Sequence, residues 1–130
     1  MAQSAGFHEQ TELLQPATRD RHRAIVSIME ELDAVDWYDQ RIDAAQDKDL
    51  KRILAHNRDE EKEHAAMVLE WLRRRDPELD KNLRQYLFID TPILEREEAL
   101  EKEEAEEEES AAGAGDGSLG IGSLRAEVRK

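Results

Sequence analysis

The sequence contains no cysteine, few aromatic residues and a deficit of positive charge. Without cysteine among its 130 residues, thiolate metal sites, iron–sulfur clusters and disulfides are excluded, and carboxylate and imidazole remain as the strong metal ligands. Lys and Arg number 19 against 32 Asp and Glu, which gives a formal net charge of −13. Nucleic-acid binding depends on clustered Lys and Arg, so this balance excludes a nucleic-acid partner and suits the handling of cations.

Long apolar runs are also missing. No segment approaches the roughly 20 consecutive apolar residues that span a bilayer, and the first fifteen residues lack the basic and apolar regions of a secretory signal. We therefore expect a cytoplasmic protein without a membrane partner. Charged residues make up 39% of the chain and aromatic residues 5%, which is a thin supply for a core in so short a chain. A partner chain is expected to complete the core.

Apolar residues recur at intervals of three and four from about Thr11 to Ile42, which predicts a long amphipathic helix. Pro16 is compatible with this helix only near its first turn. The polar residues 43–49 then predict a turn.

A second apolar stripe begins at Leu50, includes Val68 and Trp71, and is followed by basic residues and Pro77, which suit a helix end. We read Trp71 as a core residue. Two long helices joined by a short turn form an antiparallel hairpin, so the predicted fold class is all-α.

The hairpin is expected to form most of a helical domain that spans residues 11–100. Residues 1–10 are predicted to be a flexible N-terminus, and residues 78–100 carry a weaker pattern of one or two short helices. Residues 101–118 are predicted to be a linker, in which 101–109 are too charged to bury anything and the small residues 110–118 are flexible. Apolar residues reappear beyond it within residues 119–130, where isolated hydrophobes usually bind another protein. They are Leu119, Ile121 and Leu124.

Glu61 and His64 form a Glu-x-x-His motif within the segment DEEKEHA. Residues three apart share one face of a helix and can converge on one ion. The motif is common in acidic sequences, but here it lies on the apolar stripe of the second helix. Burying an unpaired carboxylate is costly unless it is paired, protonated or bound to metal.

Glu31 lies on the apolar stripe of the first helix, at the height of Glu61. Both residues are fifteen positions from residue 46, in the middle of the predicted turn. At about 1.5 Å per residue, both lie roughly 22 Å from the turn. One chain therefore supplies a Glu and a Glu-x-x-His motif, half of a ferritin-like carboxylate site. This predicts a two-fold dimer that completes both the four-helix core and a metal site for iron, manganese or zinc.

The alternative is a polar layer without metal, in which Glu31 pairs with a basic residue across the hairpin. Neither helix offers Lys or Arg on the stripe at this height, because Arg58 and Lys62 point elsewhere. His56 and Glu60 also have metal-binding spacing but lie off the stripe, so we expect them to face water.

Other residues near Glu31 have less certain roles. Glu30 and Asp33 lie with Trp37 on a neighbouring strip, either as an outer carboxylate site for calcium or another divalent ion, or as a solvated helix face. Tyr38 is a hydrogen-bond donor to the site, a redox-active neighbour or a core residue.

The segments HRAIVSIMEELDAVDWYDQRIDA and ILAHNRDEEKEHAAMVLEWLRR closely resemble the encapsulated ferritins, the ferroxidase cargo of encapsulin nanocompartments. The resemblance covers most of residues 20–90, and the segment DGSLGIGSLR resembles an encapsulin localisation peptide. It implies a di-iron ferroxidase centre between two subunits, with Glu31, Glu61 and His64 of each subunit as ligands. It also implies Tyr38 beside the centre and an outer site formed by Glu30, Asp33 and Trp37.

The resemblance further implies a ring of dimers, a decamer, in the lumen of an encapsulin shell. Leu119, Ile121 and Leu124 would dock on the inner wall of the shell, and iron would be oxidised by the ring and stored in the lumen. Two other hypotheses stay open: a metal-binding protein without catalysis, and a structural helical oligomer without metal.

Overall fold

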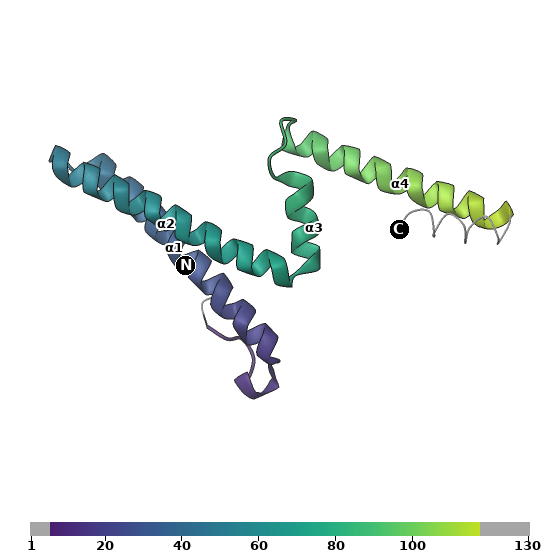
Figure 1. Ribbon diagram of the computed structural model, residues 1–130, viewed down its shortest axis with the longest axis horizontal. Helices are drawn as coiled ribbons and strands as arrows, with labels where there is room; N and C mark the ends of the chain where they lie inside the picture. The colour runs from purple at the N-terminus through teal and green to yellow at the C-terminus, as the bar shows by residue number, and fades with distance from the viewer. Residues whose placement is uncertain (1–5, 118–130) are drawn as a thin grey trace. The chain divides into compact units, whose positions relative to one another are not determined.

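A computed structural model describes residues 6–117, and all regular structure in this part of the chain is helical (Figure 1). The elements are a short 3-10 helix η1 (Thr11–Leu13) and the helices α1 (Pro16–Ala44), α2 (Lys48–Arg75), α3 (Pro77–Tyr86) and α4 (Ile93–Gly117). The predicted all-α fold with a helix hairpin is confirmed. The chain divides into two units, Met1–Lys81 and Asn82–Lys130.

The first unit is built on the hairpin of α1 and α2, which lie side by side in Figure 1. The turn between them is residues 45–47, shorter than the predicted 43–49 but centred on the same residue. Asp47 opens α2, because its Oδ1 accepts a hydrogen bond of 2.8 Å from the backbone N–H of Leu50. Three arginines occupy the last turn of α2, where positive charge complements the helix dipole.

The start of α1 differs from the expected start at Thr11. Pro16 takes the first helical position, where its missing N–H costs nothing, and residues 11–13 form η1 instead. The segment before α1 also contacts it, and the flexibility that we expected for residues 1–10 stays a prediction. The Phe7 ring stacks on His22 with 4.2 Å between the ring centroids, and Arg19 donates a hydrogen bond to the Thr11 carbonyl.

The core of the hairpin is narrow. Among the described residues, Ala24, Ala65 and Leu72 are the hydrophobic residues that are buried. The other residues of the predicted stripes, such as Ile28 and Val68, are half-buried. A single layer of side chains between two helices cannot enclose them further.

Helix α3 follows α2 after one residue. The Asp76 Oδ1 accepts a hydrogen bond of 3.0 Å from the N–H of Leu79, and Pro77 takes the first helical position. Arg73 of α2 forms an ion pair with Asp80 of α3. These contacts set the start of α3 relative to the end of α2.

The second unit contains the end of α3 and all of α4. Between them, Arg96 donates a hydrogen bond of 2.9 Å to the Gln85 carbonyl. Helix α4 continues to Gly117, so residues 101–117 are helical where we expected a linker. Glu is a good helix former, and an exposed helix needs no apolar face to hold its backbone hydrogen bonds. Residues 119–130 lie outside the described residues, and their role in docking stays a prediction.

None of the helices within residues 6–117 has the length and apolar character needed to cross a membrane.

Candidate metal centre

Glu31 on α1 and the pair Glu61 and His64 on α2 meet across the hairpin. The His64 Nδ1 lies 3.7 Å from the Glu31 Oε2 and 3.7 Å from the Glu61 Oε2. One ligand atom from each of the three residues lies within 4.8 Å of the others. The spacing of three on α2 and the matched distance from the turn produce this convergence, as the sequence predicts. Within residues 6–117, no other group of three such residues is close enough to hold a metal ion.

The cluster is partly open to solvent. The side chains of Glu31 and Glu61 are each 25% exposed and that of His64 is 43% exposed. Three protein ligands on one side of an ion leave its remaining coordination positions free for water, substrate or ligands from another chain. The geometry is that of a candidate site with three protein ligands and an open side.

The electrostatics of the cluster favour a cation. A hydrogen bond with Glu61 raises the pKa of Glu31, burial and the negative charge of Glu61 raise this pKa further, and His64 partly opposes the shift. The Glu31 Oε2 is buried without a hydrogen-bond partner. A buried lone pair with no donor is costly, and a bound metal ion would satisfy it and cancel the repulsion between the two carboxylates.

The basic residues near the cluster are engaged elsewhere. The Arg58 Nη1 lies 2.9 Å from the Asp39 Oδ1 and its Nε lies 3.2 Å from the Asp59 Oδ1. Lys62 pairs with Asp59 at 3.5 Å. Neither residue therefore forms the cross-hairpin ion pair with Glu31 that was the alternative to a metal site.

The ion pair between Asp39 and Arg58 joins the two helices and was not predicted. This pair lies where the two helices of the hairpin meet. Together with the apolar stripe, it sets which residues of the two helices face each other. Counting residues from the turn along both helices could have suggested such pairs of opposite charge. Because long side chains reach over several residues, however, this count does not identify which two residues pair.

The residues predicted to flank the cluster lie on α1. Glu30, Asp33 and Trp37 are exposed, and Trp37 is 52% exposed. Glu30 and Asp33 do not join a third ligand residue within the described part of the chain. Tyr38 is half-buried, and the Arg41 guanidinium lies 5.5 Å from the centroid of its ring. Tyr38 therefore lies at the edge of the contact between the two helices rather than fully in a core.

Two further predictions concern residues on α2 away from the cluster. His56 and Glu60 form an ion-pair contact of 2.9 Å and face solvent, with their side chains 70% and 52% exposed. Trp71 is half-buried rather than enclosed, with the Arg75 guanidinium 4.1 Å from its ring centroid.

A helix hairpin that carries a Glu on one helix and Glu-x-x-His on the other matches half of the residue set found in ferritin-like carboxylate proteins. Comparison with known families agrees: the chain belongs to the EncFtn-like family, that of the encapsulated ferritin-like proteins, whose model matches residues 6–90. The chain is 60% identical over 132 aligned positions to the encapsulated ferritin-like protein of Rhodospirillum rubrum, covering 98% of this chain and 94% of the relative.

Two further comparisons extend this result. A stretch of 78 residues is 40% identical to the encapsulin nanocompartment cargo protein EncC of Myxococcus xanthus, covering 60% of each chain. The crystal structure of a Nitrosomonas europaea protein matches with a TM-score of 0.66 and 64% sequence identity, over 68% of this chain and 97% of that one. The hairpin is thus shared with a solved structure of closely similar sequence.

Proposed function

We propose that the protein is a ferroxidase that oxidises Fe(II) to Fe(III) with O2 at a di-iron centre shared between two copies of the chain. The observation that carries this proposal is the Glu31, Glu61 and His64 cluster, whose ligand atoms lie within 4.8 Å of one another. Membership of a ferritin-like family supports iron as the metal.

The ligands of this cluster fit iron. Carboxylate oxygen and imidazole nitrogen suit Fe(II), and the orphaned Glu31 Oε2 provides a buried acceptor for a cation. Two copies would supply four carboxylates and two neutral imidazoles, the ligand set of ferritin-like di-iron sites. Four negative charges balance two divalent ions.

Each of the three residues of the cluster has its own role in the proposed activity. Glu31 and Glu61 would bind the incoming Fe(II), and their negative charge would stabilise the Fe(III) product. His64 would complete the ligand set as a neutral imidazole, because a protonated ring cannot bind metal. Each Fe(II) gives one electron to O2, which takes up protons and leaves as peroxide or water according to whether two or four iron ions react.

The assembly and location belong to the same proposal. We infer that dimers assemble into a ring, a decamer, and that residues 119–130 attach this ring to an encapsulin shell, with Leu119, Ile121 and Leu124 in contact with the shell. The name of the Myxococcus xanthus relative supports an encapsulin partner. We further infer that Glu30, Asp33 and Trp37 form an outer site for calcium or another divalent ion on the path to the centre.

The test is aerobic addition of Fe(II) to the metal-free protein. An enzyme should produce Fe(III) absorbance much faster than Fe(II) in buffer, and metal analysis should find about two bound ions per dimer. A metal-binding protein without catalysis would bind the ions but leave the oxidation rate at that of the buffer. A structural oligomer would bind no ions and would likewise leave the oxidation rate at that of the buffer.

A further inference from the structure

Two basic side chains lie close to the candidate metal cluster in the sequence. Arg58 precedes Glu61 by three positions and Lys62 follows it directly, and no other Lys or Arg lies within seven positions of a cluster residue. A cationic side chain competes with a metal ion for the same carboxylate, because both neutralise its charge. Metal binding therefore depends on where these two side chains are held.

Arg58 is the basic residue that lies on the side of α2 next to the cluster. Residues three apart on a helix are neighbours, and side chains lean toward the start of the helix, so Glu61 leans over the turn that carries Arg58. The Arg58 side chain is 25% exposed and therefore lies against the hairpin. Lys62 projects from a different side of the helix, because adjacent residues do not face each other. Without another partner, Arg58 would pair with Glu61.

Two aspartates hold the Arg58 guanidinium instead. Its Nη1 lies 2.9 Å from the Asp39 Oδ1 across the hairpin, and its Nε lies 3.2 Å from the Asp59 Oδ1. Asp39 follows Glu31 by eight residues on α1, which places it about 12 Å closer to the turn of the hairpin than the cluster. The guanidinium is therefore drawn along the hairpin, away from the cluster.

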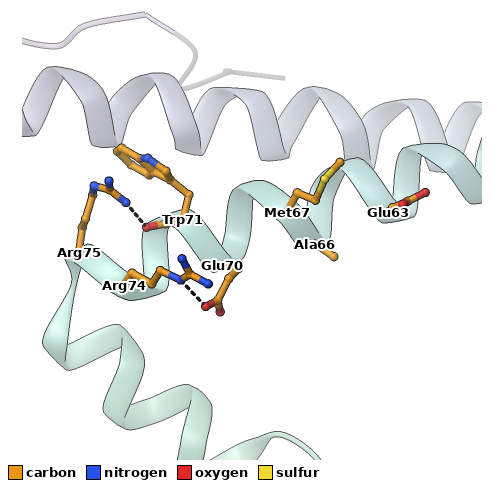
Figure 2. Close-up of a pocket in the computed structure, with 7 residues that line it drawn as sticks. All are labelled: Glu63, Ala66, Met67, Glu70, Trp71, Arg74 and Arg75. Carbon is orange, nitrogen blue, oxygen red and sulfur yellow. Dashed lines mark hydrogen bonds and ion pairs between the residues drawn. The ribbon is translucent and has the colours of Figure 1, made fainter.

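The arginines near the end of α2 have a different arrangement. Figure 2 shows Arg74 paired with Glu70 at 2.7 Å, and Arg75 donating a hydrogen bond of 3.2 Å to the Trp71 carbonyl. Both contacts lie within one helix, and both arginines are more than two turns beyond the cluster. Arg58, by contrast, is close to the cluster and is paired with the other helix of the hairpin.

We propose that Asp39 and Asp59 are positioning residues that hold the Arg58 guanidinium away from Glu61 and so keep the cluster open to a metal ion. The inference rests on the proposed function, because it takes the cluster as the metal site. Once released from both aspartates, Arg58 pairs with the Glu61 carboxylate. There it occupies a ligand and repels the incoming cation. Metal affinity then falls although all three ligands are unchanged.

Metal titration of three variants tests this role. The probe is Mn²⁺, which suits oxygen and nitrogen ligands, and binding to the cluster is the part that Glu31→Ala abolishes. The variant Asp39→Asn/Asp59→Asn should bind Mn²⁺ at the cluster at least about fivefold more weakly than the unaltered protein, because it releases Arg58. Adding Arg58→Gln to this variant should restore the affinity to within about twofold, because the competing cation is gone.

The variant Asp36→Asn/Glu60→Gln is the matched control for the loss of charge. It removes two negative charges from the same two helices, at positions nearer to the cluster residues along the chain. Asp36 accepts a hydrogen bond from Gln40, and Glu60 contacts His56. If charge alone acted, this control would lose at least as much affinity as the aspartate variant. We expect it to stay within about twofold of the unaltered protein, because exposed charges are screened.

The single variant Arg58→Gln separates competition from a purely structural role of the ion pair. It should bind Mn²⁺ at least as well as the unaltered protein, because it only removes a cation. If the pair acted through helix packing alone, Arg58→Gln would lose as much affinity as the aspartate variant and would not restore binding when combined with it. Either of those results would overturn the proposal.

Failure of the proposed function gives a different result. Equal Mn²⁺ binding by the unaltered protein and Glu31→Ala would refute the metal site itself, and this proposal with it. A cluster that binds Mn²⁺ with equal affinity in the unaltered protein and in Asp39→Asn/Asp59→Asn would retain the metal site and refute the positioning role alone.

Discussion

At the scale of the residue, the side chains of the candidate metal cluster converge on one place although two of them repel each other. Glu31 and Glu61 approach each other closely enough that the pKa of Glu31 is raised, chiefly through the hydrogen bond with Glu61. In a protein that binds no cation here, replacing one of the two carboxylates with an apolar side chain would increase the stability of the fold. That all three groups point to one place argues that their function is to bind an ion together.

Replacing Glu31 or His64 with Ala should therefore abolish most metal binding without harming the fold. We expect metal affinity to fall at least roughly tenfold, since even removal of residues that only support a ligand costs this much. The free energy of unfolding of metal-free Glu31→Ala should not fall, because the change removes a buried carboxylate beside another. Metal titration and denaturant unfolding measure the two effects.

The matched control is Glu95→Gln, which removes one negative charge from the exposed first turn of α4. It should bind metal as the unaltered protein does. Unchanged metal content in both Glu31→Ala and His64→Ala would show that the cluster is a polar layer and not a metal site.

At the scale of the element, the two ends of α2 are secured by different means. Asp47 caps the start of the helix, while the end is held by an ion-pair network around Glu70. Arg73 lies 2.6 Å from the Glu70 carboxylate, Arg74 lies 2.7 Å from it, and Arg73 also pairs with Asp80 of α3. Hydrogen bonds from Arg73 and then Arg74 lower the pKa of Glu70 to about 2.

This network should make the stability of the chain depend on Glu70 at neutral pH but not in acid. A lowered pKa in the folded state contributes stability above the ordinary pKa of Glu, and this contribution is lost as the pH falls through the folded value. The variant Glu70→Gln should therefore melt below the unaltered protein at pH 6, and the difference should shrink between about pH 4.5 and pH 2.

Thermal melts followed by circular dichroism at several pH values measure this difference. Glu98→Gln, on the exposed surface of α4, serves as the comparison and should show no such pH dependence. A Glu70→Gln variant whose melting temperature differs by the same amount at pH 2 and pH 6 would contradict the role of this carboxylate. The effect is expected to be modest, because the network is open to solvent.

At the scale of the whole molecule, the described part of the chain encloses little of its own apolar surface. Few of its residues are buried, the candidate metal cluster is partly open to solvent, and large apolar side chains are exposed along α2. The second copy of the chain in the proposed function would cover the hairpin. The proposed encapsulin shell is a different partner, for which residues 119–130 are the proposed contact.

Deleting residues 119–130 should separate these two functions. We expect the truncated protein to lose co-purification with a co-expressed encapsulin shell protein, because Leu119, Ile121 and Leu124 are removed. The rate of aerobic Fe(II) oxidation should be unchanged, because the cluster and the hairpin remain. Unchanged packaging of the truncated protein would disprove the proposed targeting role of this segment.

The amino-acid pattern alone predicts the hairpin and the level at which Glu31 and Glu61 lie. Apolar periodicity defines which face of each helix is buried, and the turn centred on residue 46 places Glu31 opposite Glu61 with no knowledge of distant contacts. The helical state of residues 101–117 does not follow from the apolar pattern, because this segment has no apolar stripe; Glu itself favours helix.

The contacts that the side chains make follow only from the packing of the two helices. The pairing of Arg58 with Asp39, the orphaned Glu31 Oε2 and the openness of the cluster depend on the packing of two helices against each other. The periodicity of apolar residues indicates which side of a helix faces inward. It does not indicate how far a long side chain reaches or which side chains stay exposed to solvent. Which residues converge therefore follows from the sequence pattern, while the packing of the helices leaves the candidate cluster partly open to solvent.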